Sequence, residues 1–105
     1  MNSKQKNTQD KFEILRKIQL NPQSSQRAMA EELGFSIGKL NYILKELKKK
    51  GLVKLKNFQN QNNKIKYLQY VITPKGISER TKLTVSFMKR KLKEYEELKK
   101  ELKKK

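Results

Sequence analysis

The hydrophobic positions between residues 26 and 47 repeat with the spacing of two short helices. Leu33 lies four residues after Met29 and three residues after Ala30, a spacing that places all three on one face of a helix. Gly34 follows where a helix readily ends in a residue with positive φ, and Ser36 stands where a second helix needs a cap. Apolar residues then return with the spacing +3, +4, +3, at Ile37, Leu40, Leu44 and Leu47. Two helices joined by a short glycine-containing turn are typical of a helix-turn-helix.

The outward face of the second helix carries amide, phenol and ammonium groups and no carboxylate. Its residues are Lys39, Asn41, Tyr42, Lys45 and Lys48. The alternative is an ordinary helical hairpin whose outer face is merely solvated. We favour the helix-turn-helix because a small residue at the helix crossing, a glycine in the turn and buried apolar residues on the second helix all agree.

A further helix is predicted before this pair. Its core face comprises Phe12, Ile14, Leu15 and Ile18. We expect it to begin between Thr8 and Asp10 and to end at Asn21, because the residue before Pro22 avoids the helical region. Residues 1–9 are polar and predict a disordered tail. Ser24 or Ser25 can cap the next helix.

The period changes after Gly51, which follows three lysines and suits the end of a helix. Residues 52–58 approach strand alternation, with Val53 and Leu55 on one side. Residues 59–66 form a polar loop, and the aromatic and β-branched residues 67–72 predict a return strand. The expected fold class is therefore mainly α with a small β-hairpin, a winged helix-turn-helix domain over residues 10–73.

The remaining residues, 74–105, predict one long helix that starts with Thr73 as its cap and Pro74 in its first turn. Its apolar residues follow a heptad spacing, at Val85, Met88, Leu92, Tyr95 and Leu102, with Lys99 in the position of a missing apolar residue. Leu83 and Phe87 are expected to face the domain. We interpret the helix as a coiled-coil-like dimerisation element, the alternative being a frayed helix that folds back on the hairpin.

Charge and composition narrow the function. The chain of 105 residues carries 27 basic against 10 acidic side chains, a formal charge of +17, which predicts an anionic partner. It has neither cysteine nor histidine, and no catalytic or phosphate-binding motif is apparent, so we expect no enzyme activity, no metal and no cofactor. No secretory signal or membrane span is apparent either, and we expect a cytoplasmic protein without a membrane partner.

The run SSQRAMAEELGFSIGKLNYILKELKKKGLV resembles the DNA-binding core of MarR-type winged-helix regulators. The wing and the segment after it, KNFQNQNNKIKYLQYVITPKGISERTKLTVSFMKRKLKEYEELK, are similar to the small MarR-type regulators associated with exopolysaccharide gene clusters. The resemblance runs from about Phe12 to Leu102 and implies a homodimeric regulator of transcription that binds double-stranded DNA. Longer MarR proteins have further helices that enclose a small-molecule pocket, and a chain of this length leaves little room for them, so no effector is expected.

The resemblance assigns roles to particular side chains. It implies a recognition helix that uses Ser36, Lys39, Asn41, Tyr42 and Lys45. We expect further contacts to the DNA backbone from the first turn of the preceding helix, the end of the recognition helix and the wing. These residues are Ser25, Gln26, Arg27, Lys48, Asn60, Asn62, Asn63, Lys64 and Lys66.

Other binding functions remain open at this stage. RNA or single-stranded DNA could stack on Tyr42, Phe58, Tyr67 and Tyr70, although those aromatics also suit the core or its rim. A winged helix can serve as a protein-docking module, and the last helix could bind an anionic membrane surface as a basic amphipathic helix. The lysine and asparagine face of the second helix favours DNA over protein docking.

Overall fold

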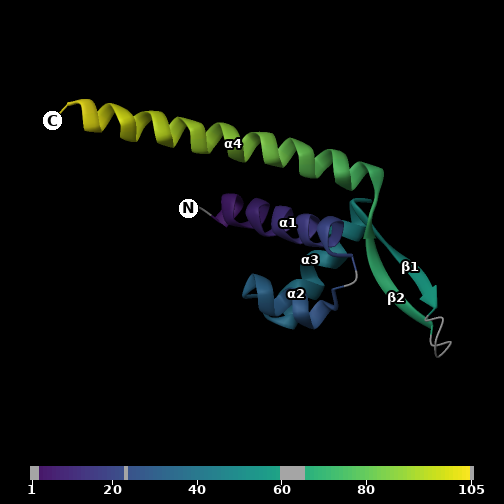
Figure 1. Cartoon of the computed structure of the whole chain (residues 1–105). Coiled ribbons are helices and arrows are strands. Elements are labelled where there is room, and N and C mark those ends of the chain that lie inside the picture. The colour runs from purple at the N-terminus through teal and green to yellow at the C-terminus, as the bar shows by residue number, and fades with distance from the viewer. Residues whose placement is uncertain (1–2, 23, 60–65, 105) are drawn as a thin grey trace.

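The computed structural model describes residues 3–22, 24–59 and 66–104 (Figure 1). The helices and strands follow in the order α1 Ser3–Leu20, α2 Gln26–Leu33, α3 Ile37–Lys49, β1 Val53–Gln59, β2 Lys66–Ile72 and α4 Pro74–Lys103. The two strands pair as an antiparallel hairpin. This arrangement confirms the predicted fold class, a winged helix-turn-helix followed by a long C-terminal helix.

Three hydroxyl groups cap helices as the sequence predicts. The Oγ atoms of Ser25 and Ser36 each accept a hydrogen bond of 3.1 Å, from the backbone N–H groups of Ala28 and Lys39. Thr73 Oγ1 accepts from the backbone N–H of Gly76 at 3.0 Å. Gly34 ends α2 at a φ of 72°, in the left-handed region that glycine adopts without strain. The turn between α2 and α3 is therefore determined by residues inside it.

Helix α1 begins earlier than expected. The predicted start between Thr8 and Asp10 is wrong, and residues 3–9, which we expected to be a disordered tail, are helical. Residues 1 and 2 lie outside the described residues. The segment contains neither glycine nor proline, and its glutamine and lysine residues have good helix propensity, so the helix extends toward the N-terminus. The division between a domain of residues 10–73 and a separate last helix stays a prediction.

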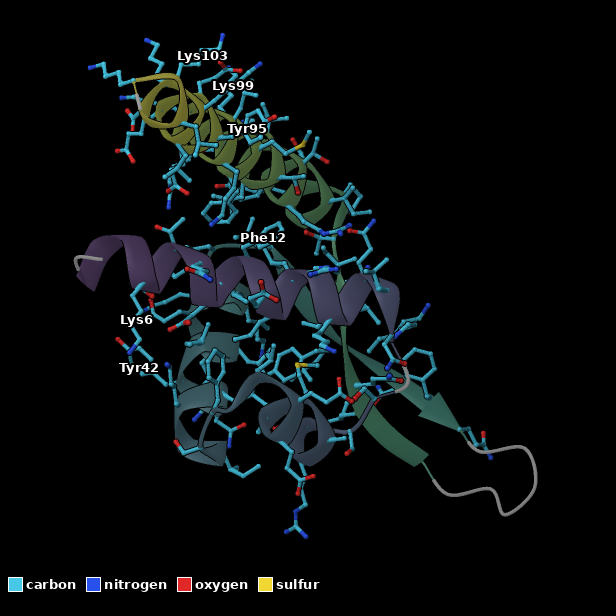
Figure 2. All side chains as sticks on the ribbon, turned by 60° about the vertical axis from the view of Figure 1, so that its left-hand side comes forward. Lys6, Phe12, Tyr42, Tyr95, Lys99 and Lys103 are labelled. Atoms are coloured by element: carbon cyan, nitrogen blue, oxygen red, sulfur yellow. The ribbon has the colours of Figure 1, made fainter. Side chains whose placement is uncertain are left out.

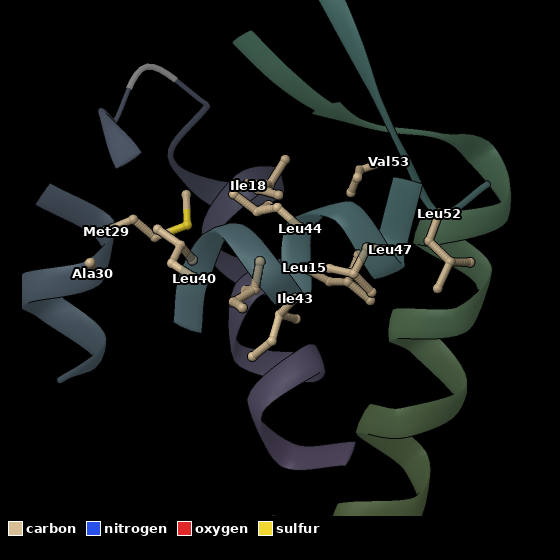
Figure 3. Close-up of a cluster of buried hydrophobic side chains, with 11 residues drawn as sticks. Leu15, Ile18, Met29, Ala30, Leu40, Ile43, Leu44, Leu47, Leu52 and Val53 are labelled. Carbon is tan, nitrogen blue, oxygen red and sulfur yellow. The ribbon is translucent and has the colours of Figure 1, made fainter. Parts of the chain in front are cut away.

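The hydrophobic core lies where α1, α2 and α3 meet the start of the hairpin (Figure 3). Helix α3 contributes the largest share, four buried residues on one face from Leu40 to Leu47. Ile37, which was expected on the same face, is 44% exposed because it lies in the first turn, beyond the core. The core side chains are Ile14, Leu15, Ile18, Met29, Ala30, Leu40, Ile43, Leu44, Leu47, Leu52 and Val53. Tyr70 and Ile72 of β2 pack against this cluster from the wing side, so the wing is anchored by the face that alternation predicts.

The junction between the hairpin and α4 is tightly built. Thr73 donates its backbone N–H to the Leu52 carbonyl at 3.0 Å, and its hydroxyl lies 2.7 Å from the Gly51 carbonyl oxygen. Gly76, in the first turn of α4, is buried against Leu52. These contacts determine the direction in which α4 leaves the domain.

Helix α4 lies alongside α1 and then extends beyond it, which makes the molecule elongated at 66 × 26 × 26 Å (Figure 1). The Phe12 and Phe87 rings meet edge to face with centroids 5.0 Å apart. Arg80 donates from Nη1 to the Gln19 side-chain oxygen at 2.9 Å. The prediction that Phe87 faces the domain is thus confirmed, and the last turns of α4 are exposed on every side.

Candidate nucleic-acid interface

The first turn of α2 presents an anion-binding end to solvent. Ser25 uses its hydroxyl as the cap, while Gln26 and Arg27 are exposed in the first turn. No acidic residue lies in that turn. Unpaired backbone N–H groups and the helix dipole favour an anion at such an end, and a guanidinium adds a formal charge. The three predicted backbone-contact residues of α2 are therefore brought together at one exposed helix end.

The outermost stripe of α3 is formed by residues at the spacing +4, +3, +4. All of them are exposed: Gly38, Tyr42, Lys45 and Lys49. Tyr42 has 68% of its surface exposed and points from α3 into solvent (Figure 2). Since the opposite face of α3 is buried in the core, this stripe is the part of the helix that another molecule meets first. Gly38 and Lys49 belong to it although the sequence analysis did not assign them, and the helical spacing would have identified both.

Three predicted recognition residues lie beside this stripe or are engaged elsewhere. Ser36 is the cap of α3, so its hydroxyl already accepts a hydrogen bond. Lys39 is half-buried, with Nζ 3.0 Å from the Asp10 carboxylate and 4.1 Å from the centre of the Phe35 ring. Asn41 is half-buried at the edge of the stripe. The structure therefore leaves Tyr42 and Lys45 as the freely presented members of the predicted set.

The wing contributes cations from its outer face. Lys54 and Lys56 on β1 are exposed, because they alternate with Val53 and Leu55, which point inward. Neither lysine was among the predicted DNA contacts, although strand alternation is the signal that places both outward. The predicted wing residues Asn60, Asn62, Asn63 and Lys64 lie outside the described residues. Lys66 begins β2, and its side chain is outside the description.

Among the aromatic side chains of the hairpin that the structure describes, Phe58 and Tyr70 do not form an open stacking platform. Tyr70 packs against the core, and Phe58 is half-buried with the Lys56 ammonium 5.7 Å from its ring centre. Tyr42, on α3, is exposed but stands on a different element. Of the four aromatics considered for single-strand stacking, Tyr67 has no described side chain, and only Tyr42 among the others is fully presented.

A second group of lysines lies where α1, α3 and α4 meet. Lys75 donates from Nζ to the Lys50 carbonyl at 3.0 Å, which ties the start of α4 to the end of α3. A side-chain hydrogen bond with Lys50, together with partial burial and the positive charge of Lys50, lowers the pKa of Lys11, and Glu46 partly opposes this shift. Lys48, predicted as a backbone contact, is exposed in the last turn of α3.

The predicted seam of α4 is exposed throughout. The exposed fractions are 46% for Val85, 65% for Met88, 60% for Leu92, 60% for Tyr95 and 76% for Leu102. Lys99 is exposed as well. Figure 1 shows α4 extending past α1, and Figure 2 labels Tyr95 and Lys99 near the C-terminal end of α4. A row of apolar side chains in water is the feature of this molecule that most requires a partner.

Two further features of the described residues bear on other functions. No group of three or more histidine, cysteine, aspartate or glutamate side chains there could hold a metal ion. Within the same part of the chain, every helix is too short or too polar to cross a membrane.

The comparisons with known proteins agree with this geometry. Residues 11–54, which include the helix pair, match the family model for winged helix-turn-helix DNA-binding domains. No curated protein matches the chain in sequence. Several solved structures share the fold, among them regulators of the MarR family.

Three of these structures illustrate the similarity. The PcaV transcriptional regulator from Streptomyces coelicolor, in complex with its natural ligand, aligns with a TM-score of 0.62 at 16% identity over 76% of this chain and 55% of its own. A MarR family transcription regulator aligns with a TM-score of 0.65 at 21% identity over 88% of this chain and 62% of its own. MepR from S. aureus, in a complex with DNA, gives 0.57 at 19% identity over 92% and 73%. The chain thus has the fold of these regulators and spans between about half and two thirds of the first two.

Proposed function

We propose that this chain is a MarR-type transcription regulator that binds double-stranded DNA as a homodimer. The observation that carries the proposal is the exposed stripe of α3, with Tyr42 and Lys45 at its centre. The capped end of α2 and the exposed lysines of β1 add further groups that can bind phosphate. The formal charge of +17 supports an anionic partner. The resemblance of the sequence to MarR-type regulators and the shared fold support the choice of DNA.

In this proposal the α3 stripe enters the major groove, whose width admits one α-helix. Lys45 contacts a guanine edge or a phosphate, and the Asn41 amide reaches an adenine edge from the rim of the stripe. The α2 end and the wing bind phosphates on either side, which fixes the position of the helix in the groove. Lys39 joins them only if its ion pair with Asp10 opens.

The DNA-binding proposal is tested by selecting the preferred site from random duplexes and titrating it against variants. Lys45→Ala is expected to lose at least tenfold in affinity, because it removes a freely presented cation from the centre of the stripe. Asn41→Ala should lose about 1–3 kcal/mol on the selected site and little on random duplex, as a base-reading residue does. The matched control is Lys82→Ala, an exposed lysine of α4 outside the interface.

Two outcomes would contradict this assignment. Equal losses for Lys45→Ala and Lys82→Ala would show that only total charge matters and that α3 does not face the DNA. Preferential binding to single-stranded DNA or RNA of the same sequence would favour the alternative in which Tyr42 stacks on bases.

The homodimer is proposed from the exposed seam of α4. Leu92→Lys places a charge in the middle of the seam, where burial against a partner would desolvate it. The variant should sediment as a monomer at micromolar concentration and bind a palindromic site far more weakly, with its helical content unchanged. Ser86→Lys adds the same charge on another exposed face of α4 and should remain dimeric. If Leu92→Lys still sediments as a dimer, the dimer interface does not include the seam of α4.

The regulated genes are proposed from resemblance alone. Because the wing and the following segment are similar to regulators of exopolysaccharide gene clusters, we propose that the operator lies upstream of such genes. Enrichment of genomic fragments bound by the chain tests this statement. Enriched fragments that lie beside unrelated genes would contradict the proposed control of exopolysaccharide genes, but not the proposed binding of DNA.

A further inference from the structure

The apolar stripe of α4 includes one residue more than the heptad pattern predicts. Leu98 has 60% of its surface exposed and lies between Tyr95 and Leu102, so the stripe runs without interruption from Val85 to Leu102. The six side chains expose on the order of 700 Å² per chain, close to the roughly 800 Å² per partner of a standard interface. The stripe is therefore large enough for a second copy of α4.

A groove accompanies the first half of this stripe. Its volume is about 730 Å³, and it is lined by residues of α4 and by Phe12 of α1. Five of the lining residues are apolar, Phe12, Val85, Phe87, Met88 and Leu92, and the other three are Thr84, Lys89 and Lys91. Phe12 packs edge to face on Phe87, and these two rings form the bottom of the groove. The groove is open to solvent beside Met88 and Leu92.

The charge along α4 is distributed unevenly. Residues 80–93 carry six basic side chains and no acidic one. Residues 94–103, the rest of the helix, carry four glutamates and three lysines, and two more lysines follow. Two such helices aligned in the same direction would place their basic halves together, whereas opposite directions place each basic half beside the nearly neutral half that holds the four glutamates. Like charges side by side raise the free energy of the pair, and opposite charges lower it.

We propose that the α4 helices of two copies pair in antiparallel orientation about a two-fold axis between Lys93 and Glu94. This arrangement rests on the proposed homodimer and specifies its joint. It places Leu92 opposite the partner's Tyr95 and Val85 opposite the partner's Leu102. Both pairs are equidistant from the axis, as an isologous contact requires.

The same register accounts for the polar residues of the stripe. Lys99 falls opposite the partner's Met88, where its aliphatic stem packs and its ammonium reaches water. Lys89 falls beside the partner's Glu96, and the two-fold axis repeats the pair. In a parallel pair Lys99 would face the partner's Lys99 at the centre of the seam.

The register also provides an occupant for the groove beside Phe12. The partner's Leu98 lies level with residues 84–91, on the side of the seam where Thr84 and Lys91 line the groove. A parallel pair would leave Leu98 exposed and the groove without this side chain. The antiparallel pair places the two winged domains at opposite ends of the joined helices, each with its wing directed away from the axis (Figure 1).

Cysteine cross-linking tests orientation and register directly, because the natural chain contains no cysteine. Disulfides form only when the two Cα atoms lie within about 7 Å. Val85→Cys mixed with a size-tagged Leu102→Cys chain should give the mixed cross-linked species on mild oxidation. Each variant alone serves as the matched control and should cross-link at least tenfold less. Both substitutions are at exposed positions, so the domain should remain folded.

The outcomes separate this inference from the proposed function. Efficient cross-linking of Val85→Cys to itself, in a sample that sediments as a dimer, would establish a parallel pair and overturn the inference while the homodimer stands. A monomer in sedimentation without any cross-link would overturn both. Leu98→Asp provides an independent measurement: the antiparallel register predicts at least a tenfold weaker dimer, and an unchanged dissociation constant would contradict the seating of Leu98 beside Phe12.

Discussion

Gly76 is the residue whose enlargement should disturb the fold most directly. A Cβ atom added there would lie 2.0 Å from the Leu52 carbonyl oxygen and 2.7 Å from Cγ1 of Ile72. Real Cβ atoms do not approach closer than about 3 Å, so α4 and the α3–β1 junction must separate by about 1 Å. The Leu52 carbonyl also accepts hydrogen bonds from Thr73. The group that the new Cβ would displace is therefore a hydrogen-bonded backbone carbonyl and not a flexible side chain.

The magnitude follows from two opposing effects. Replacing glycine by alanine inside a helix gains up to about 1 kcal/mol of propensity. Overpacking a closely packed site costs about 1–3 kcal/mol, and a clash with backbone falls at the upper end or beyond it. We expect Gly76→Ala to lower the free energy of unfolding by about 2 kcal/mol or more, which corresponds to a midpoint about 8 °C or more lower.

Urea and thermal unfolding followed by circular dichroism measure this difference. Gly38→Ala is the matched control, because nothing lies within 4 Å of the added Cβ and Gly38 is also in the first turn of a helix. The control should be as stable as the parent or more stable, by up to about 1 kcal/mol. If Gly76→Ala matches the control, the close approach of α4 to Leu52 does not exist in solution and the reasoning fails.

Three further predictions follow from charges. Affinity for duplex DNA should fall with salt along a log–log slope of roughly −5 to −9, if a dimer neutralises about six to ten phosphates; a slope near zero in titrations would exclude the phosphate-based mode. Asp10→Asn should release Lys39 from its ion pair, which should cost at most about 1 kcal/mol of stability and raise the affinity for DNA. An unchanged affinity in the same titration would show that Lys39 does not reach the phosphates. The lowered pKa of Lys11 means that the folded chain binds that proton more weakly than the unfolded chain, so stability should rise as pH increases toward 10.5. Lys11→Gln should therefore be slightly more stable than the parent at pH 7, and the advantage should disappear by pH 10.5; a variant less stable than the parent at pH 7 would contradict this.

Local signals determined most of the fold. Ser25, Ser36 and Thr73 each cap a helix with a hydroxyl that lies three residues from the N–H it accepts from, so the sequence predicts those boundaries. Gly34 ends α2 because its φ of 72° suits glycine and few other residues. The hydrophobic face of α3 and the alternation of Val53 and Leu55 follow from the periods of helix and strand. Each of these features depends on neighbours a few residues away.

The tertiary structure decided which predicted residues are free to act. Lys39 is held by Asp10, and nothing in the spacing of α3 indicates a partner 29 residues earlier in the chain. The groove beside Phe12 exists only because α1 lies along α4, and that packing also sets Phe87 apart from the exposed stripe. The early start of α1 likewise escaped prediction, because its first turn has no capping signal strong enough to mark it. Periodicity reports which face of an element is apolar, whereas the pairing of faces is decided by packing between segments far apart in sequence.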